Sequence, residues 1–382
     1  MSEEFIPYGK QWIDEADIEA VARVLRGQWL TTGPAVERFE EEIARVAGAR
    51  YAVALNSGTA ALHAAYRAVG VGPGTEVVVP PLTFSATANA ARLLGATVRF
   101  CDVDEKTLTM DPAALKEVVG EKTAVVAAVD YAGHSADLDP ILKVARSVGA
   151  KVVCDGAHSL GGRYRGKPIG SRADLTTFSF HPVKAATAGE GGAVVTDNER
   201  WAARMGRFRN HGMIRNEGGP TGEEGGAWSY DIEEIGYNYR ITDLQCALGL
   251  SQLRKLDGFV DRRRQIAGRY RRLLKDVQEV ELPPDEPWCD HAYHLFVIRV
   301  PQARRREIFD VLRAKGIGVQ VHYIPVNMLS AYRRLGHRAE DTPVALRNYR
   351  RLISIPCYPA MADEEVERVA RAVREAVGGR RP

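Results

Sequence analysis

One lysine in this chain of 382 residues lies in a setting that suits covalent chemistry. Lys184 is flanked by small residues in SFHPVKAATAGEGG (179–192), and a strand-like run, AVVTD, follows this loop. A lysine amine condenses with carbonyl compounds to form a Schiff base. A solvated lysine near a turn is the simpler interpretation, and the lysine alone does not distinguish the two.

A carboxylate and a histidine occur together earlier in the chain. Asp155 ends the apolar run KVVCD, where it needs a partner because an unpaired buried charge is costly. It could cap the turn, or it could keep a heterocyclic nitrogen protonated, as an aspartate does for pyridoxal phosphate. His158 could then reach the same ring or the substrate, although a lone histidine is more often structural.

A third segment could bind a phosphate. In NSGTAAL (56–62) a strand-like run ends, Ser-Gly-Thr follows and a helical pattern begins. Exposed amides and the positive end of the helix dipole favour a phosphate there, although Ser57 or Thr59 could equally be a helix cap. Phe84, in PPLTFSAT, could stack on a ring or belong to the core. A phosphate site, a carboxylate and an amine are the protein parts that pyridoxal phosphate needs, so together they predict a site for this cofactor.

The elements that would position these residues alternate between strand and helix. Seven short apolar runs are separated by helical patterns or turns, at 51–55, 77–80, 97–103, 124–130, 151–155, 175–180 and 192–197. This pattern is typical of an α/β fold with a mostly parallel sheet that is covered on both faces. Ligands of such sheets bind outside the carboxyl ends of the strands, where residues 57–59, Asp155 and the Lys184 loop fall.

A different pattern begins near residue 250. Residues 251–277 have the spacing of one long amphipathic helix, a proline-rich break follows, and strand-like runs at 294–300 and 318–325 flank another helical pattern. We therefore predict a large domain at 1–250 and a smaller α+β domain at 251–382. The glycine-rich segment 215–230 is predicted to be a mobile surface loop.

The composition of the chain excludes few classes of protein. The net charge is +3, from 52 basic and 49 acidic residues, and does not favour nucleic acid or an anionic membrane as a partner. The arginine clusters 261–265 and 303–307 lie in helical patterns and are interpreted as solvated helix faces. Five scattered cysteines without CxxC spacing predict neither disulfides nor a metal site. Neither a signal peptide nor an apolar membrane segment is visible, which favours the cytoplasm.

Taken together, the motifs resemble those of the DegT/DnrJ/EryC1/StrS family of sugar aminotransferases, which are fold-type I pyridoxal phosphate enzymes. The resemblance runs nearly from end to end, through GQWLTTGP (27–34), NSGTAAL, PPLTFSATANA, CDGAHSLGG (154–162), the Lys184 loop, RNHGM (209–213), GYNYRITDLQCALGLSQL (236–253) and VHYIP (321–325). Within the family, DYAGHSAD (130–137) and the loops around Lys184 and 319–326 most resemble enzymes of the pseudaminic acid route. Those enzymes aminate C4 of a UDP-linked 4-keto-6-deoxy-N-acetyl-hexosamine.

The resemblance implies a role for each matching residue. Lys184 would form the Schiff base, Asp155 would pair with the pyridine nitrogen, and His158 would face the ring hydroxyl. The phosphate would be held by Gly58, Thr59, Ser179 and, from the neighbouring subunit, Asn238. The protein would then be a homodimer with shared active sites, and Leu244, Ala247, Leu248 and Gly249 are suited to close packing against another surface. The substrates would be L-glutamate and a nucleotide sugar, with the sugar pocket formed from residues 29–33, including Thr32 and Gly33, from His322 and Tyr323, and from the 215–230 loop.

Three alternatives remain open at the level of sequence. Sugar 3-dehydratases resemble this family but carry histidine where Lys184 stands, so the lysine disfavours that activity. A non-catalytic regulator that keeps the fold and the cofactor is a second alternative. The third is an aminotransferase for another keto sugar, dTDP- or GDP-linked and aminated at C3 or C4, because motifs do not encode the shape of the pocket.

Overall fold

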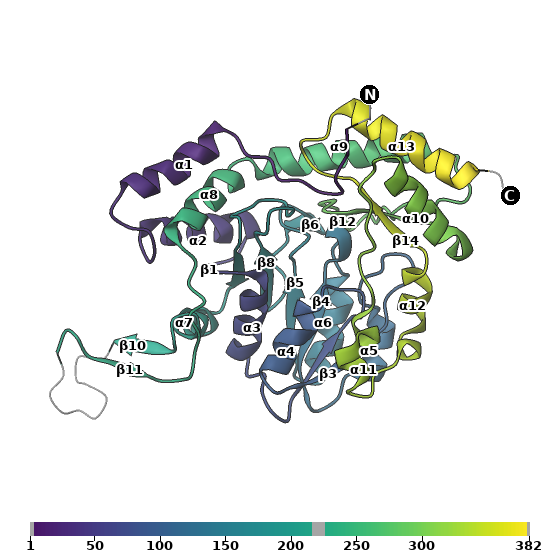
Figure 1. The fold of residues 1–382 in the computed structure, drawn as a ribbon. Helices are drawn as coiled ribbons and strands as arrows, with labels where there is room; N and C mark the ends of the chain where they lie inside the picture. The colour runs from purple at the N-terminus through teal and green to yellow at the C-terminus, as the bar shows by residue number, and fades with distance from the viewer. Residues whose placement is uncertain (1–3, 216–225, 380–382) are drawn as a thin grey trace.

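The seven apolar runs form a single sheet. The protein is described here by a computed structural model, which covers residues 4–215 and 226–379. The strand order is β1-β9-β8-β5-β4-β2-β3, and β9 alone runs antiparallel to its neighbours (Figure 1). The strands are β1 (Tyr51–Leu55), β2 (Glu76–Val79), β3 (Thr97–Phe100), β4 (Thr123–Val129), β5 (Lys151–Asp155), β8 (Leu175–Ser179) and β9 (Gly192–Thr196). The predicted mostly parallel, seven-stranded α/β sheet is confirmed.

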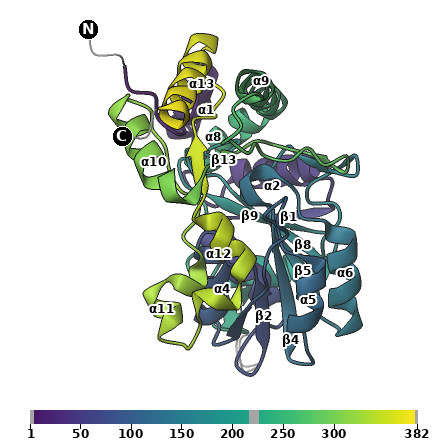
Figure 2. The same cartoon turned by 90° about the vertical axis from the view of Figure 1, so that its right-hand side faces the viewer.

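Helices cover both faces of this sheet. One face packs against α2 (Pro34–Ala47), α5 (Pro112–Val118), α6 (Leu138–Ser147) and α8 (Asp243–Leu253). The other face packs against α3 (Gly58–Ala68), α4 (Ala86–Leu93) and α7 (Glu199–Phe208). Figure 2 shows α5 and α6 on one side of the strands and α4 on the other. Burial on both faces explains why the strands are continuous apolar runs rather than alternating ones.

Two helix starts follow from capping residues in the predicted motifs. The Ser57 side chain accepts a hydrogen bond from the Ala60 N–H and so caps α3 directly after β1 ends. Thr242 and Gln245 form a reciprocal capping box at the start of α8. Each cap satisfies a first-turn N–H group, which has no partner inside its helix.

The C-terminal part has its own apolar core. It contains α9 (Leu256–Leu274), α10 (Arg305–Ala314), α13 (Asp363–Gly378) and the antiparallel pair β13 (Phe296–Arg299) and β14 (Leu352–Ile355). Ile6, from the other end of the chain, is buried in the same core. The division at residue 250 stays a prediction. No helix within the described ranges is long and apolar enough to cross a membrane.

The described residues form further helices and strands. They are α1 (Glu15–Arg26), α11 (Ser330–Arg333), α12 (Pro343–Tyr349), the three-stranded group β6 (Arg163–Tyr164), β7 (Lys167–Pro168) and β12 (Cys289–Asp290), and the hairpin of β10 (Met213–Arg215) and β11 (Tyr230–Ile232). The hairpin projects from the sheet below α7 in Figure 1. Most of the predicted mobile loop 215–230, namely 216–225, lies outside the described residues.

Two predictions about secondary structure were wrong. The single helix expected at 251–277 is divided between α8 and α9, and Arg254 and Lys255 lie at the junction. The strand expected at 318–325 is reduced to one bridge between Gln320 and Ser354. In a strand, consecutive side chains point to opposite faces, whereas His322 and Tyr323 both line one cavity.

Candidate active site

A cavity of about 500 Å³ lies where the β5 and β8 strands end. Its walls include nine residues that the sequence singled out, namely Gly58, Thr59, Phe84, Asp155, His158, Ser179, Lys184, His322 and Tyr323. These residues come from segments far apart in the chain, and the sheet brings them to a common edge. This is the position at which open α/β sheets bind their ligands.

The lysine is held by the connection between two paired strands. β8 and β9 pair antiparallel, and the Phe180 N–H donates to the Gly191 carbonyl at 2.9 Å, which closes the base of the loop. Inside the loop, the Lys184 N–H donates to the His181 carbonyl at 3.0 Å. Burial lowers the pKa of the Lys184 amine to about 8, the Asp155 carboxylate opposes this change, and the Arg263 guanidinium adds to it. At neutral pH a larger fraction of this amine is therefore neutral, and nucleophilic, than in a lysine of ordinary pKa.

Asp155 is a buried carboxylate with partners on both oxygens. The Thr87 hydroxyl, on α4, donates to one oxygen at 2.7 Å, and the Ala157 N–H donates to the other at 3.2 Å. Burial raises the pKa of Asp155, and these two hydrogen bonds and the Lys184 charge oppose the increase. A carboxylate oxygen accepts more than one hydrogen bond, so Asp155 can also receive one from a protonated ring nitrogen.

Three histidines and a tyrosine line the same cavity. His158 Nε2 lies 3.0 Å from the Tyr323 hydroxyl, and its ring lies 4.3 Å from that of His294, centroid to centroid. His322 Nδ1 lies 2.8 Å from the Ser354 hydroxyl. Burial, followed by the positive charge of Lys184, lowers the pKa of His158 well below its usual value and that of His322 to about 4. These rings are therefore neutral at pH 7.

His158 also carries a polar atom with an open bonding position. Its Nδ1 is buried and has no hydrogen-bond partner in the part of the chain that the structure describes. Such an atom is costly unless a ligand pairs with it. The ring and this atom fit a cofactor ring that bears a hydroxyl group.

The start of α3 makes a narrow recess beside Ser179. A Cβ atom on Gly58 would lie 3.0 Å from the Ser179 Cβ, and one on Gly192 would lie 2.2 Å from the Ser57 carbonyl oxygen. Only glycine at these two positions permits the start of α3 to lie so close to the end of β8 and the start of β9. The first-turn N–H groups of a helix carry partial positive charge and bind phosphate well. With the amine and the carboxylate, this recess completes a set of residues that fits pyridoxal phosphate.

Phe84 lies at the edge of this cavity rather than in the core. Its side chain is 61% exposed, and its ring centroid lies 6.3 Å from that of Tyr323. This exposure excludes the interpretation of Phe84 as a core residue, which the sequence left open. Stacking of Phe84 on a bound ring stays a prediction.

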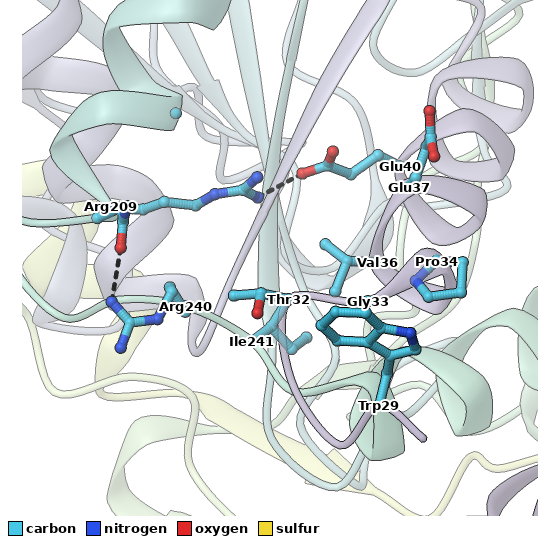
Figure 3. A pocket seen from close by; sticks show the side chains of 12 residues that line it. Trp29, Thr32, Gly33, Pro34, Val36, Glu37, Glu40, Arg209, Arg240 and Ile241 are labelled. Carbon is cyan, nitrogen blue, oxygen red and sulfur yellow. Dashed lines mark hydrogen bonds and ion pairs between the residues drawn. The ribbon is translucent and has the colours of Figure 1, made fainter. Parts of the chain in front are cut away.

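Three predicted site residues do not reach this cavity within one chain. Thr32 and Gly33 line a separate pocket of about 580 Å³, beside Trp29 and across from Arg209 and Arg240 (Figure 3). In that pocket Arg209 pairs with Glu40. Asn238 is exposed, and its backbone carbonyl accepts a hydrogen bond from the Asn56 side chain at 3.4 Å. The roles expected of these three residues stay predictions.

The structure adds residues that the sequence did not single out. Tyr8, His294 and Glu190 line the cavity, and Arg263 contacts the backbone of the Lys184 loop. Arg263 had been assigned to a solvated helix face, but it is 1% exposed, so that interpretation was wrong. A signal was present, because residues 259, 263, 266 and 270 are spaced as one buried face of a helix.

The comparisons with known proteins agree with this geometry. Residues 11–374 match the model of the DegT/DnrJ/EryC1/StrS aminotransferase family, and the chain belongs to this family. It is 40% identical to the spore coat polysaccharide biosynthesis protein SpsC of Bacillus subtilis, over 98% of each chain. It is 37% identical to a UDP-4-amino-4,6-dideoxy-N-acetyl-beta-L-altrosamine transaminase of Campylobacter jejuni, over 93% of each chain.

Two solved structures have the same fold as this chain. Spr1654 of Streptococcus pneumoniae in its PLP form superposes with a TM-score of 0.91 at 31% identity, and covers 98% of this chain and 99% of its own. PseC of Helicobacter pylori, an aminotransferase of pseudaminic acid biosynthesis, superposes with a TM-score of 0.92 at 30% identity, and covers 99% and 100%. The fold is that of the fold-type I enzymes, and the protein is a pyridoxal phosphate-dependent sugar aminotransferase.

Proposed function

We propose that this enzyme transfers the amino group of L-glutamate to C4 of a UDP-linked 4-keto-6-deoxy-N-acetyl-hexosamine. The observation that carries the proposal is the convergence of Lys184, Asp155 and His158 on one cavity beside the α3 recess. The choice of sugar is supported by the named activity of the Campylobacter relative, which spans 93% of this chain. The cytoplasmic location predicted from the sequence is kept as part of this proposal.

Each residue has a role that follows from its surroundings. Pyridoxal phosphate supplies an electron sink for the carbanion that forms at the substrate. The Gly58 and Thr59 amides and the Ser179 hydroxyl hold the phosphate, and Asp155 keeps the ring nitrogen protonated. Lys184 Nζ holds the cofactor and, once free, moves a proton to and from the substrate carbon as a general base and acid.

The substrate proposal is tested with a panel of keto sugars. The enzyme, loaded with pyridoxal phosphate and supplied with L-glutamate, is offered UDP-, dTDP- and GDP-linked keto sugars, and the product is identified by mass and by NMR. We expect the highest kcat/KM with the UDP-linked 4-keto sugar and an amine at C4. A preference for a dTDP- or GDP-linked sugar, or amination at C3, would replace this substrate with the alternative one.

The role of Lys184 is tested by Lys184→Ala. Borohydride reduction of the loaded wild-type enzyme should fix the mass of the cofactor on the peptide that contains Lys184. The variant should lose this mass and at least about 10²-fold in turnover, because general acid–base transfer alone contributes that much. Circular dichroism provides the control for folding. Turnover close to that of the wild type would remove Lys184 from the mechanism.

A further inference from the structure

Arg263 is a buried cation without an acidic partner. It lies on α9, its side chain is fully enclosed, and it forms no ion pair with any carboxylate of residues 4–215 or 226–379. Its neighbours Arg262 and Arg264 instead pair with Asp363 and Asp261. A buried charge that lacks a counter-ion is costly, and such groups occur mainly where they serve a function.

Among the residues that the structure describes, the guanidinium donates hydrogen bonds only to backbone carbonyls. One nitrogen donates to the carbonyls of Tyr293, His294 and Cys357, with distances of 3.3 Å and 3.1 Å for the first two. The other terminal nitrogen donates to the carbonyl of Val183 at 3.4 Å. That last carbonyl belongs to the peptide bond that joins Val183 to Lys184. One side chain of the C-terminal part thus holds the backbone of the lysine loop and of a second segment that lines the cavity.

We propose that Arg263 is a positioning residue for Lys184, which fixes the Val183–Lys184 peptide and places an uncompensated positive charge near the amine. The inference rests on the proposed role of Lys184. A cation close to a lysine disfavours its protonated form, as in other enzymes whose lysine nucleophile is activated by a neighbouring charge. Arg263 is suited to this task because it stays protonated even when buried.

The groups around the Lys184 amine change its pKa in both directions. Burial lowers the pKa of Lys184 most, Asp155 raises it, and Arg263 lowers it. The other titratable side chains that line the cavity are Tyr8, His158, His181, Glu190, His294, His322 and Tyr323. Burial lowers the pKa of His158, His294 and His322 and raises that of Tyr323, which favours the neutral form of all four. Arg263 also interacts with the Cys357 thiol, whose pKa is raised by burial to about 11, so this thiol stays neutral at neutral pH. Arg263 is therefore a permanent positive charge that acts on Lys184 in the direction opposite to Asp155.

The test measures the titration of Lys184 itself. The full-length chain, freed of cofactor, is pulsed with acetic anhydride between pH 6 and 10, and acetylation of the Lys184 peptide is followed by mass spectrometry. In Arg263→Gln, which keeps an N–H donor but loses the charge, the midpoint should move upward. A rise of about one unit means tenfold less neutral amine at a fixed pH below the midpoint. Arg262→Gln, one residue away on α9 and directed at α13, is the matched control and should keep the wild-type midpoint.

A second neutral variant guards against a failure to fold. If Arg263→Gln does not fold, Arg263→Met is used, because an apolar side chain of similar length leaves no unpaired charge. An unchanged midpoint in the neutral variants overturns the proposal.

The cofactor gives a readout that separates this inference from the proposed function. Pyridoxal phosphate is added at each pH, and its attachment to Lys184 is trapped with borohydride. If the wild type does not attach it, the proposed function fails. If the wild type attaches it and Arg263→Gln shows the same pH dependence, only the role of Arg263 fails.

Discussion

Asp130 is a second buried carboxylate, close to Asp155 and directly after β4. One of its oxygens accepts a hydrogen bond from the Ala136 N–H at 2.9 Å, and the other accepts one from the Ser159 hydroxyl at 2.5 Å. Burial raises the pKa of Asp130 to about 6, and the negative charge of Asp155 adds to this increase. Ser159 follows His158 directly, so Asp130 supports the segment that carries a proposed active-site residue.

The raised pKa predicts a pH-dependent stability. The folded protein binds this proton more tightly than the unfolded chain, whose aspartate has a pKa near 3.8, so the stabilisation is present at low pH and lost as the pH rises through 6. Relative to Asp130→Asn, the wild type should lose about 2 kcal/mol of unfolding free energy between pH 4 and pH 7, because the unfolded aspartate is already partly ionised at pH 4. Urea denaturation of both chains measures this difference.

An exposed aspartate supplies the control for this experiment. The Arg374 guanidinium lowers the pKa of Asp276 to about 2, outside the pH range of the test. Asp276→Asn should therefore change the unfolding free energy by the same amount at both pH values. A difference between the wild type and Asp130→Asn that is also constant with pH would mean that Asp130 titrates normally.

At the scale of residues, the sequence predicted those that end a strand or begin a helix. Asp155, Gly58 and Ser179 were found because the chain changes direction there, and such positions converge in a parallel sheet. Arg263 and His294 were missed because their placement depends on how the C-terminal part packs on the sheet. No local pattern distinguishes a buried arginine bonded to carbonyls from a solvated one, except its position on the apolar face of α9.

At the scale of elements, the decisive feature is the contact between the start of α3 and the start of β9. Gly192 lies so close to Ser57 that an added Cβ would overlap its carbonyl oxygen at 2.2 Å. Gly192→Ala should push β9 away from α3 and widen the proposed phosphate recess. Loss of one charge-assisted hydrogen bond costs about 1.5–3 kcal/mol, so pyridoxal phosphate should bind about 10- to 150-fold more weakly. Titration of the cofactor absorbance measures this affinity.

Gly258→Ala is the matched control for that substitution. Gly258 lies within α9, and an added Cβ would meet no atom within 4 Å. Alanine is the better helix former by about 1 kcal/mol, so the variant should be slightly more stable and should bind the cofactor as the wild type does. If Gly192→Ala also binds the cofactor normally, the recess does not hold the phosphate.

At the scale of the whole molecule, the fold could be predicted because strand, helix and turn signals agreed along the first 200 residues. Less could be predicted about which faces of the helices are buried within the chain. Ala247 and Gly249 were expected to pack against another surface, but both are buried within the chain, and a Cβ on Gly249 would meet the Phe39 ring at 2.6 Å. Leu244 and Leu248 are partly exposed on the same helix. A single sequence does not tell which of two helix faces meets its own sheet.

The exposed side chains near Asn238 are consistent with the proposed shared site. Trp29, Ile235 and Tyr237 are large apolar residues with exposed fractions of 56%, 81% and 43%. Tyr237 and Tyr239 come directly before and after Asn238 in the sequence, and their rings stack on each other with centroids 4.8 Å apart. If the segment crosses a two-fold axis, each chain lends its asparagine to the cavity of the other.

Mixing two inactive variants tests this arrangement directly. Asn238→Ala should retain the fold and bind pyridoxal phosphate about 10- to 150-fold more weakly, since it loses one hydrogen bond to a charged phosphate. Lys184→Ala should be inactive for the reason given above. In a mixed dimer, one cavity combines an intact Lys184 with the partner's intact Asn238, so at subsaturating cofactor about half of the activity per mixed dimer should return. Native mass spectrometry verifies the exchange of subunits. No recovery after verified exchange, or full activity in a monomer, would mean that each chain builds its active site alone.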